Sequence, residues 1–493
     1  MALPPSGRGG DGLVDELPPD VVWSTLLLMC AIATFLGVAK VTSLLSGNRK
    51  SNETLPPYAP GSMLKHIEMV TSKEYPWWIL DVAEKLGQRC FRVSIPSSMK
   101  NKIIIGEHTT ARRILTDPLS SKPIEIYGPM RSVNNKGDPG MFTLNGPSWH
   151  SKRKASANAF SSNLIRRMNE AALDYTDVFV ENLKSEEPRG VFDVSEAMLS
   201  VVLSALTESA FDYVISVEES ADMMHDLELA LIEFASKTPT QIHRNWFSWL
   251  IPERRRAVAA TLRLRELMCR IMNNYRENGP KSDGTIIQLI MENDSAFKTD
   301  DEKLAQLLEF FIAGHETTAY SISWVLTCLA RNPQIQAKLR SELSALTPQT
   351  WSQSKYLQMC IKEGMRLYPV AAAGSIRNVG KDLKTEGGFI LPKGSTCFIP
   401  MMLVLNNPDV YENPREYNPS RWEHPTREMM DCFIPFSLGK QNCIGQSLAN
   451  AEMQTIISRL CSEFDISVEE EGRIEFFLTL KQIGTKLRAK KVE

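Results

Sequence analysis

The chain has 493 residues, a formal net charge of -2 and 43% hydrophobic residues, the composition of a globular protein with a large buried core. The near-neutral charge argues against nucleic acid as a partner, because duplex binding normally needs a basic face and the basic runs here are short. Nine dispersed cysteines without a Cys-x-x-Cys pair argue against a disulfide framework or a zinc site and are typical of a reducing compartment.

The N-terminal region predicts a membrane anchor. Residues 21–39 are apolar apart from three hydroxyl residues, and a helix of roughly 20 residues spans a bilayer. Acidic residues precede this run, whereas Lys40, Arg49 and Lys50 follow it, so the positive-inside tendency places the C-terminal side in the cytosol. The lack of a basic n-region and of an obvious small-residue cleavage site argues against a cleaved signal peptide, and the acidic leader argues against a mitochondrial transit peptide. We therefore expect a disordered leader over 1–20 and a single-pass transmembrane anchor over 21–39.

The remainder predicts one mainly α domain with small β-sheets. Residues 40–62 include the stretch LPPYAPG and are expected to form a stiff Pro-rich linker, and nothing after it resembles a linker, so 63–493 is predicted to be a single domain. Helical periodicity covers 256–278, which ends at an Asn-Gly-Pro stop signal, and 304–331, which Gly314 is expected to interrupt. Short strands are predicted at 92–95, 102–105, 388–391 and 476–480.

The strongest chemical signal is the segment PFSLGKQNCIG over residues 435–445. An apolar-periodic helix follows it, so Cys443 is expected at a helix N-terminus, where free N–H groups and the helix dipole stabilise a thiolate and lower the thiol pKa. Gly439 and Gly445 leave room for a flat ligand close to the backbone. An isolated cysteine is usually a packing residue, but the Phe-x-x-Gly-x-x-x-Cys-x-Gly frame that begins at Phe436 favours metal ligation.

At these residues the chain resembles the cytochrome P-450 family. The resemblance implies the cytochrome P-450 fold and haem b (iron protoporphyrin IX) as the cofactor. It also implies that Cys443 is the axial metal ligand, with Phe436 and Gly439 beside the haem. A thiolate ligand pushes electron density onto iron and favours cleavage of the O–O bond.

The sequence AGHETT over residues 313–318 places an acid beside an alcohol inside the long helix. Thr317 is expected to bond back to the carbonyl of Ala313, which bends the helix and opens a groove for water. Residues 315–319 nearly match the zinc-protease motif His-Glu-x-x-His, but Ala319 occupies the position of the second histidine, which excludes a zinc protease. By the resemblance, Thr317 lines the oxygen-binding groove, Glu316 delivers protons and Ala313 lies at the cofactor. From the residues alone, a buried packing helix stays open.

Three donors are candidates to hold the haem propionates. Trp149 and Arg153 share one helix face at i, i+4, and both side chains can donate to a propionate. Arg377 resembles the family's other propionate partner, although an arginine at a strand edge is usually solvated. The chain departs from the family at Gln441, where arginine is most common, so one contact would lose its charge. Lys440 is a candidate to compensate.

Glu363 and Arg366 lie at i, i+3 in a further predicted helix. The pair alone is uninformative, because any solvated helix can carry one. With Arg421, the resemblance makes it a buried structural triad behind the haem.

The aromatic segment WFSWLIP over residues 246–252 leaves two interpretations open. Its tryptophans could form a second membrane contact beside the following arginines. Ordinary core packing explains the segment equally well.

The resemblance implies a haem-thiolate monooxygenase that inserts one atom of dioxygen into an apolar organic substrate. Electrons would come from NADPH through NADPH-cytochrome reductase, with a small electron-carrier haem protein as a possible second partner. The expected location is the endoplasmic reticulum membrane, with the catalytic domain facing the cytosol. Two alternatives stay open, a peroxide isomerase or dehydratase of the same fold, which often lacks the acid–alcohol pair, and a non-catalytic haem sensor or carrier. By the resemblance, substrate-lining residues are expected around Phe311, Ile312, Ala313 and Thr317, at Val370 to Ala373, and near Ile483.

Overall fold

The computed structural model describes residues 54–128, 140–185, 190–236 and 250–492. The expected leader over 1–20, the expected anchor over 21–39 and the aromatic segment through residue 249 lie outside the described residues.

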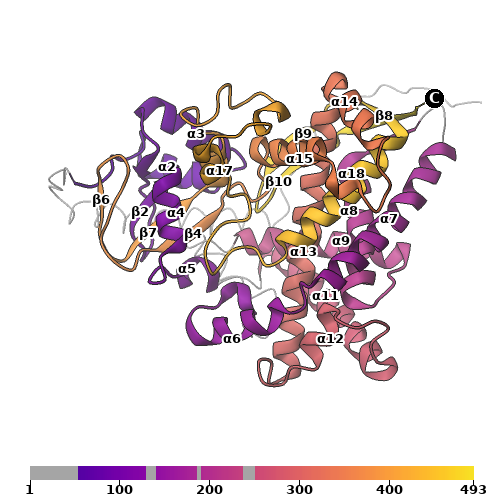
Figure 1. Ribbon diagram of the computed structural model, residues 1–493. Helices are drawn as coiled ribbons and strands as arrows, with labels where there is room; N and C mark the ends of the chain where they lie inside the picture. Colours follow the sequence, from indigo (N-terminus) through magenta and orange to yellow (C-terminus); the bar gives the residue numbers. More distant parts are fainter. Residues whose placement is uncertain (1–53, 129–139, 186–189, 237–249, 493) are drawn as a thin grey trace, which may run out of the picture.

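Helices make up most of the described chain, as the sequence predicts (Figure 1). Their bounds are α2 Met63–Val70, α3 Tyr75–Leu86, α4 His108–Thr116, α5 Ile124–Tyr127, α6 Gly146–Ala157, α7 Ser162–Ser185, α8 Val194–Phe211, α9 Val217–Ser236, α11 Pro252–Asn278, α12 Ile286–Met291, α13 Asp300–Ala330, α14 Pro333–Leu343, α15 Lys355–Leu367, α16 Met401–Leu405, α17 Arg427–Cys432 and α18 Gln446–Glu463. Short 3-10 turns are η2 Met141–Thr143, η4 Trp351–Gln353 and η5 Pro419–Trp422.

Short strands form small sheets beside these helices. Their bounds are β1 Cys90–Arg92, β2 Lys100–Ile105, β3 Val191–Asp193, β4 Ser375–Asn378, β5 Leu383–Lys384, β6 Ile390–Leu391, β7 Ser395–Ile399, β8 Phe464–Glu470, β9 Arg473–Phe476, β10 Leu480–Ile483 and β11 Lys486–Lys491. The largest sheet has the order β1-β2-β7-β4, in which β2 and β7 run parallel and the other pairs run antiparallel. In Figure 1 this sheet lies with α2, α3 and α4 on one side of the molecule, and the long helices fill the other side.

The long helix α13 forms the centre of the helical part. Thr299 caps its N-terminus by accepting a hydrogen bond from the Glu302 N–H, and the acidic first turn complements the positive end of the helix dipole. Helices α8, α11, α15 and α18 pack around it. The expected interruption at Gly314 is wrong, since α13 is continuous from Asp300 to Ala330. A Cβ at Gly314 would lie 3.1 Å from a Leu206 methyl group, so this glycine allows α8 to approach closely.

The end of the expected linker is part of the folded domain. Of residues 40–62, those from Thr54 onward are described and they dock on the sheet. Arg92 N donates to Pro57 O at 2.7 Å, and Ala59 N donates to Arg92 O at 2.8 Å. The Arg92 guanidinium also lies 4.0 Å from the centre of the Tyr58 ring. We therefore move the start of the domain from residue 63 to this docked segment.

The predicted strand over 476–480 is wrong. Phe476 ends β9 and Leu480 begins β10, and the two residues pair directly across a tight hairpin. The sequence did not indicate this turn, because the run over 476–480 contains no glycine or proline. The predicted strand at 102–105 lies within β2, while β1 ends earlier than predicted and β6 begins later.

Among the described helices, only α8 has the length and apolar composition of a membrane span. Two thirds of it (67%) is buried inside the domain, so α8 is accounted for as a core helix.

Candidate active site

The Cys443 loop is a compact turn between α17 and α18. Cys443 N donates to Phe436 O at 2.9 Å, and Asn442 N donates to Gly439 O at 3.2 Å. Gly439 has a φ of 75°, and a Cβ there would lie 2.3 Å from Leu115 O of α4, so only glycine fits. The close approach at Gly439 is made by the backbone of α4, and the room expected for a flat ligand at Gly439 and Gly445 stays a prediction.

Cys443 is exposed. The surrounding protein atoms still exclude enough water to raise the pKa of the Cys443 thiol, while the Gly445 N–H and the Arg153 guanidinium oppose this rise. Our expectation of a lowered pKa is wrong in net direction, because α18 begins only at Gln446 and desolvation outweighs the two favourable contacts. A bound cation at the sulfur would reverse that balance.

Helix α6 brings Arg153 to the same loop. Its Nη1 donates to Asn442 O at 3.0 Å and its Nη2 donates to Asn442 Oδ1 at 2.8 Å. Trp149 lies one turn earlier on α6 and is 8% exposed. The predicted i, i+4 pair on one helix is confirmed, and Arg153 also ties this helix to the residue before the cysteine.

Arg377 lies on β4 and is 3% exposed, so the expectation that a strand-edge arginine is solvated does not hold. Its Nη1 donates to the Ile376 carbonyl at 2.9 Å and lies 3.5 Å from the Tyr127 hydroxyl. Within the described residues, no carboxylate lies at ion-pair distance from this guanidinium. A buried cation without an anion is unfavourable, so we expect an anionic ligand to bind beside the Arg377 guanidinium.

These residues fit a haem. Cys443 offers a soft sulfur ligand for iron, and Arg153 and Arg377 are positive groups suited to propionates. Ala313 is exposed in the middle of α13, a helix whose other faces are buried, as expected of a residue that borders a ligand.

The acid and the alcohol of α13 have different partners. Thr317 Oγ1 donates to Ala313 O at 2.7 Å, which confirms the predicted back-bond. The buried Glu316 carboxylate forms an ion pair with Lys481 and accepts a hydrogen bond from Thr479 Oγ1 at 3.2 Å. Lys481 belongs to β10 and Thr479 to the turn before it, and sequence analysis missed both because they lie far along the chain.

Beside them, His315 is 2% exposed, and its Nε2 lies 3.1 Å from Leu199 O. Burial lowers the pKa of His315 to about 4, so the ring is neutral at physiological pH.

The predicted triad of Glu363, Arg366 and Arg421 is confirmed. Arg366 donates to both carboxylate oxygens of Glu363 at 2.9 Å, and Arg421 Nε donates to Oε1 at 2.8 Å. Trp422 Nε1 adds a hydrogen bond of 2.9 Å that sequence analysis missed. Glu363 and Arg366 are fully buried in α15, and the hydrogen bonds from Arg421 and Trp422 to Glu363 hold α15 to η5.

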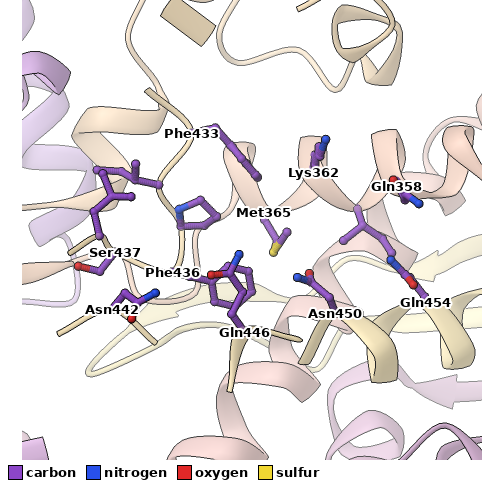
Figure 2. A pocket seen from close by; sticks show the side chains of 14 residues that line it. Gln358, Lys362, Met365, Phe433, Phe436, Ser437, Asn442, Gln446, Asn450 and Gln454 are labelled. Atoms are coloured by element: carbon purple, nitrogen blue, oxygen red, sulfur yellow. The ribbon is translucent and has the colours of Figure 1, made fainter. Parts of the chain in front are cut away.

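A pocket of about 270 Å³ lies between α15, the Cys443 loop and α18 (Figure 2). Phe436, Ser437 and Asn442 of the loop line it together with Met365 and Gln446. Neither the thiol nor the acid and alcohol of α13 lines this pocket, so it is separate from the candidate reaction site.

A family model covers nearly the whole described chain, and individual relatives match parts of it. The cytochrome P-450 family model matches residues 56–492. Taurochenodeoxycholic 6 alpha-hydroxylase of Sus scrofa is 28% identical over 357 residues, which are 66% of this chain and 70% of that protein. Ultra-long-chain fatty acid omega-hydroxylase of Homo sapiens is 32% identical over 200 residues, 38% of each chain.

The two relatives named here are hydroxylases, and the family whose model matches uses haem iron. Both findings indicate haem-dependent oxidation. Because the family model spans the domain that carries the thiol loop, the acid–alcohol helix and the buried triad, this chain belongs to the cytochrome P-450 family of haem monooxygenases.

Proposed function

We propose that this protein is a reductase-dependent haem-thiolate monooxygenase that inserts one atom of dioxygen into an apolar organic substrate. The intact pair of Glu316 and Thr317 on α13 carries this proposal, because an acid next to an alcohol is suited to proton delivery. A peroxide isomerase or dehydratase of the same fold needs no such delivery. A sensor or carrier that does not turn over would have no use for it.

Each group has one role in the proposed reaction. Cys443 ligates the iron, and the haem supplies the oxygen chemistry when bound. Trp149, Arg153 and Arg377 hold the propionates.

On α13, the Thr317 hydroxyl is fixed by Ala313 O and donates within the oxygen-binding groove. The Glu316 carboxylate, held by Lys481 and Thr479, carries the protons to that groove.

The substrate proposal rests on the relatives and on the residues expected to line the pocket. Two relatives are named as a taurochenodeoxycholic 6 alpha-hydroxylase and an ultra-long-chain fatty acid omega-hydroxylase. Of the residues expected to line the substrate site, Ala371 is exposed and Ala373, Ile312 and Ile483 are partly exposed, whereas Phe311, Val370 and Ala372 are buried. The accessible side chains named here are all apolar. We therefore propose a lipid-like substrate with an aliphatic reacting carbon.

The proposed setting is the endoplasmic reticulum membrane, with residues 21–39 as a single-pass anchor and the catalytic domain in the cytosol. The charges that flank the apolar run support this orientation. Electrons would come from NADPH through NADPH-cytochrome reductase, with a small electron-carrier haem protein as a second donor.

The first test is the visible spectrum of the dithionite-reduced full chain with carbon monoxide. A strongly red-shifted Soret band is expected for thiolate ligation. With NADPH, NADPH-cytochrome reductase and dioxygen, the protein should then hydroxylate fatty acids from a panel of chain lengths. Conversion of a fatty acid hydroperoxide without reductase, and none of the panel, would support the isomerase instead. Haem binding without any turnover would support the sensor.

A further inference from the structure

The pocket between α15, the Cys443 loop and α18 has one charged side chain and a row of carboxamides among its lining residues. We propose that this pocket is a second ligand site, which binds a small carboxylate with an apolar body and pairs it with Lys362. The thiol of Cys443 and the acid and alcohol of α13 do not line it, so this ligand is distinct from the substrate and from the haem.

The polar lining residues follow one another at helical spacing. On α18, Gln446, Asn450 and Gln454 stand at i, i+4 and i+8, so their side chains share one helix face. On α15, Gln358 and Lys362 share a face at i, i+4 in the same way. Figure 2 shows the three α18 amides on the side of that helix that faces α15. Two helices therefore present polar groups to one shared space.

The three amides on α18 are not used by the fold. Within the described residues, the side chains of Gln446, Asn450 and Gln454 form no hydrogen bond with another protein group. Gln358, on the facing helix, is engaged, because its Nε2 donates to Ser352 O at 2.8 Å. Each free amide has an NH2 donor and a carbonyl acceptor. The α18 row therefore keeps hydrogen-bonding groups that a ligand in the pocket can use.

Lys362 is the one charged side chain among the described residues that line the pocket. It is partly buried, and in the described part of the chain no carboxylate lies at ion-pair distance from its ammonium. Nζ lies 5.9 Å from the centre of the Trp422 ring. The adjacent Glu363 is paired with Arg366 and Arg421. A ligand carboxylate would therefore be the first anionic partner of Lys362, and partial burial strengthens such a pair.

The rest of the lining sets the size and nature of the ligand body. Ile361 and Met365 of α15 are buried, and Phe433 and Phe436 of the loop are partly exposed. Methionine and aromatic side chains adapt to both flat and flexible apolar groups. The volume of about 270 Å³ is just below the roughly 300 to 1,000 Å³ of pockets for drug-sized ligands. The apolar body is therefore a short chain or one or two rings.

A ligand in this pocket would contact the loop that carries the thiol. Phe436 O accepts the Cys443 N–H at 2.9 Å, and Asn442 precedes the cysteine and accepts from Arg153. Phe436 and Asn442 both line the pocket, so an occupied pocket restricts local opening of the loop. The pocket is thus placed to regulate the thiol loop from the side away from α13.

The test is isothermal titration calorimetry of the full-length ferric protein saturated with an iron-binding azole, which occupies the substrate side of the haem. The probes are two carboxylates, naphthoate and octanoate, and their neutral amides. At least one carboxylate should bind at one site per chain, and its amide should bind about tenfold more weakly because it lacks the charge. Binding of only one carboxylate would identify the apolar body as a ring or a chain.

Lys362→Met should weaken binding of that carboxylate about tenfold and leave binding of its amide unchanged. Lys338→Met is the matched control, because Lys338 of α14 also lies over an aromatic ring, at 4.2 Å from the centre of Tyr356, but does not line the pocket. This variant should bind both probes as the wild type does. If Lys362→Met does not fold, Lys362→Gln decides, since it removes the charge and keeps a polar side chain.

Amide hydrogen exchange locates the bound carboxylate. In the wild type and in Lys338→Met, the ligand should slow exchange over residues 433–446, and the same concentration should leave Lys362→Met unchanged. Equal affinity for the carboxylate and its amide would overturn the proposal, as would equal affinity of Lys362→Met and the wild type for the carboxylate. Failure of both carboxylates to bind the wild type would also overturn it. Neither measurement depends on turnover, so a protein without monooxygenase activity would leave this site standing.

Discussion

Replacing Glu363 by glutamine tests how much the buried triad stabilises the domain. The carboxylate is fully buried and receives two hydrogen bonds from Arg366, one from Arg421 and one from Trp422. Glutamine keeps the size, but its NH2 group would face donors, and Arg366 would lose its counter-charge while fully buried. Breaking such a pair from one side costs about 3 to 5 kcal/mol. That is a large part of the roughly 5 to 15 kcal/mol that stabilises a domain.

The free energy of unfolding can be followed by pulse proteolysis across a urea series. The control is Glu170→Gln, which removes the acid of the exposed i, i+4 pair with Arg166 in α7. Exposed pairs of this kind contribute no more than about 1 kcal/mol. If Glu363→Gln lowers the free energy of unfolding no more than this control does, the triad is not a stabilising element and the reasoning fails.

Three further outcomes are expected. Cys443→Ser should give folded protein without the red-shifted carbon monoxide band, because a hydroxyl is a poor substitute for a soft thiolate; a retained band would refute the ligand assignment. Thr317→Ala should keep haem but divert electrons to hydrogen peroxide, measured as peroxide formed per NADPH consumed; unchanged coupling of NADPH use to product would contradict its role. Below pH 6.5 the unfolded chain protonates His315 while the native state, with its pKa of about 4, does not, so stability should fall from pH 6.5 to pH 4. His315→Asn should make that decline shallower in urea unfolding at several pH values, and an identical decline would exclude this histidine as its cause.

Local sequence determined the chemistry-bearing motifs. The Cys443 loop, the back-bond from Thr317 to Ala313 and the pair of Arg153 with Trp149 were all predictable, because each depends on residues within a few positions of one another. The mainly helical fold followed from apolar periodicity in the same way. A turn without glycine or proline, between β9 and β10, left no comparable local signal.

Only the tertiary structure decided which charges meet. Lys481 holds Glu316 although the two residues lie far apart in sequence, and Arg377 is buried because the Tyr127 segment covers it. The direction of the Cys443 pKa depended on desolvation by neighbouring segments, which a loop sequence does not contain. Electrostatic energy in a protein depends on distance and burial in space, so sequence alone specified the reacting groups and the fold set their partners.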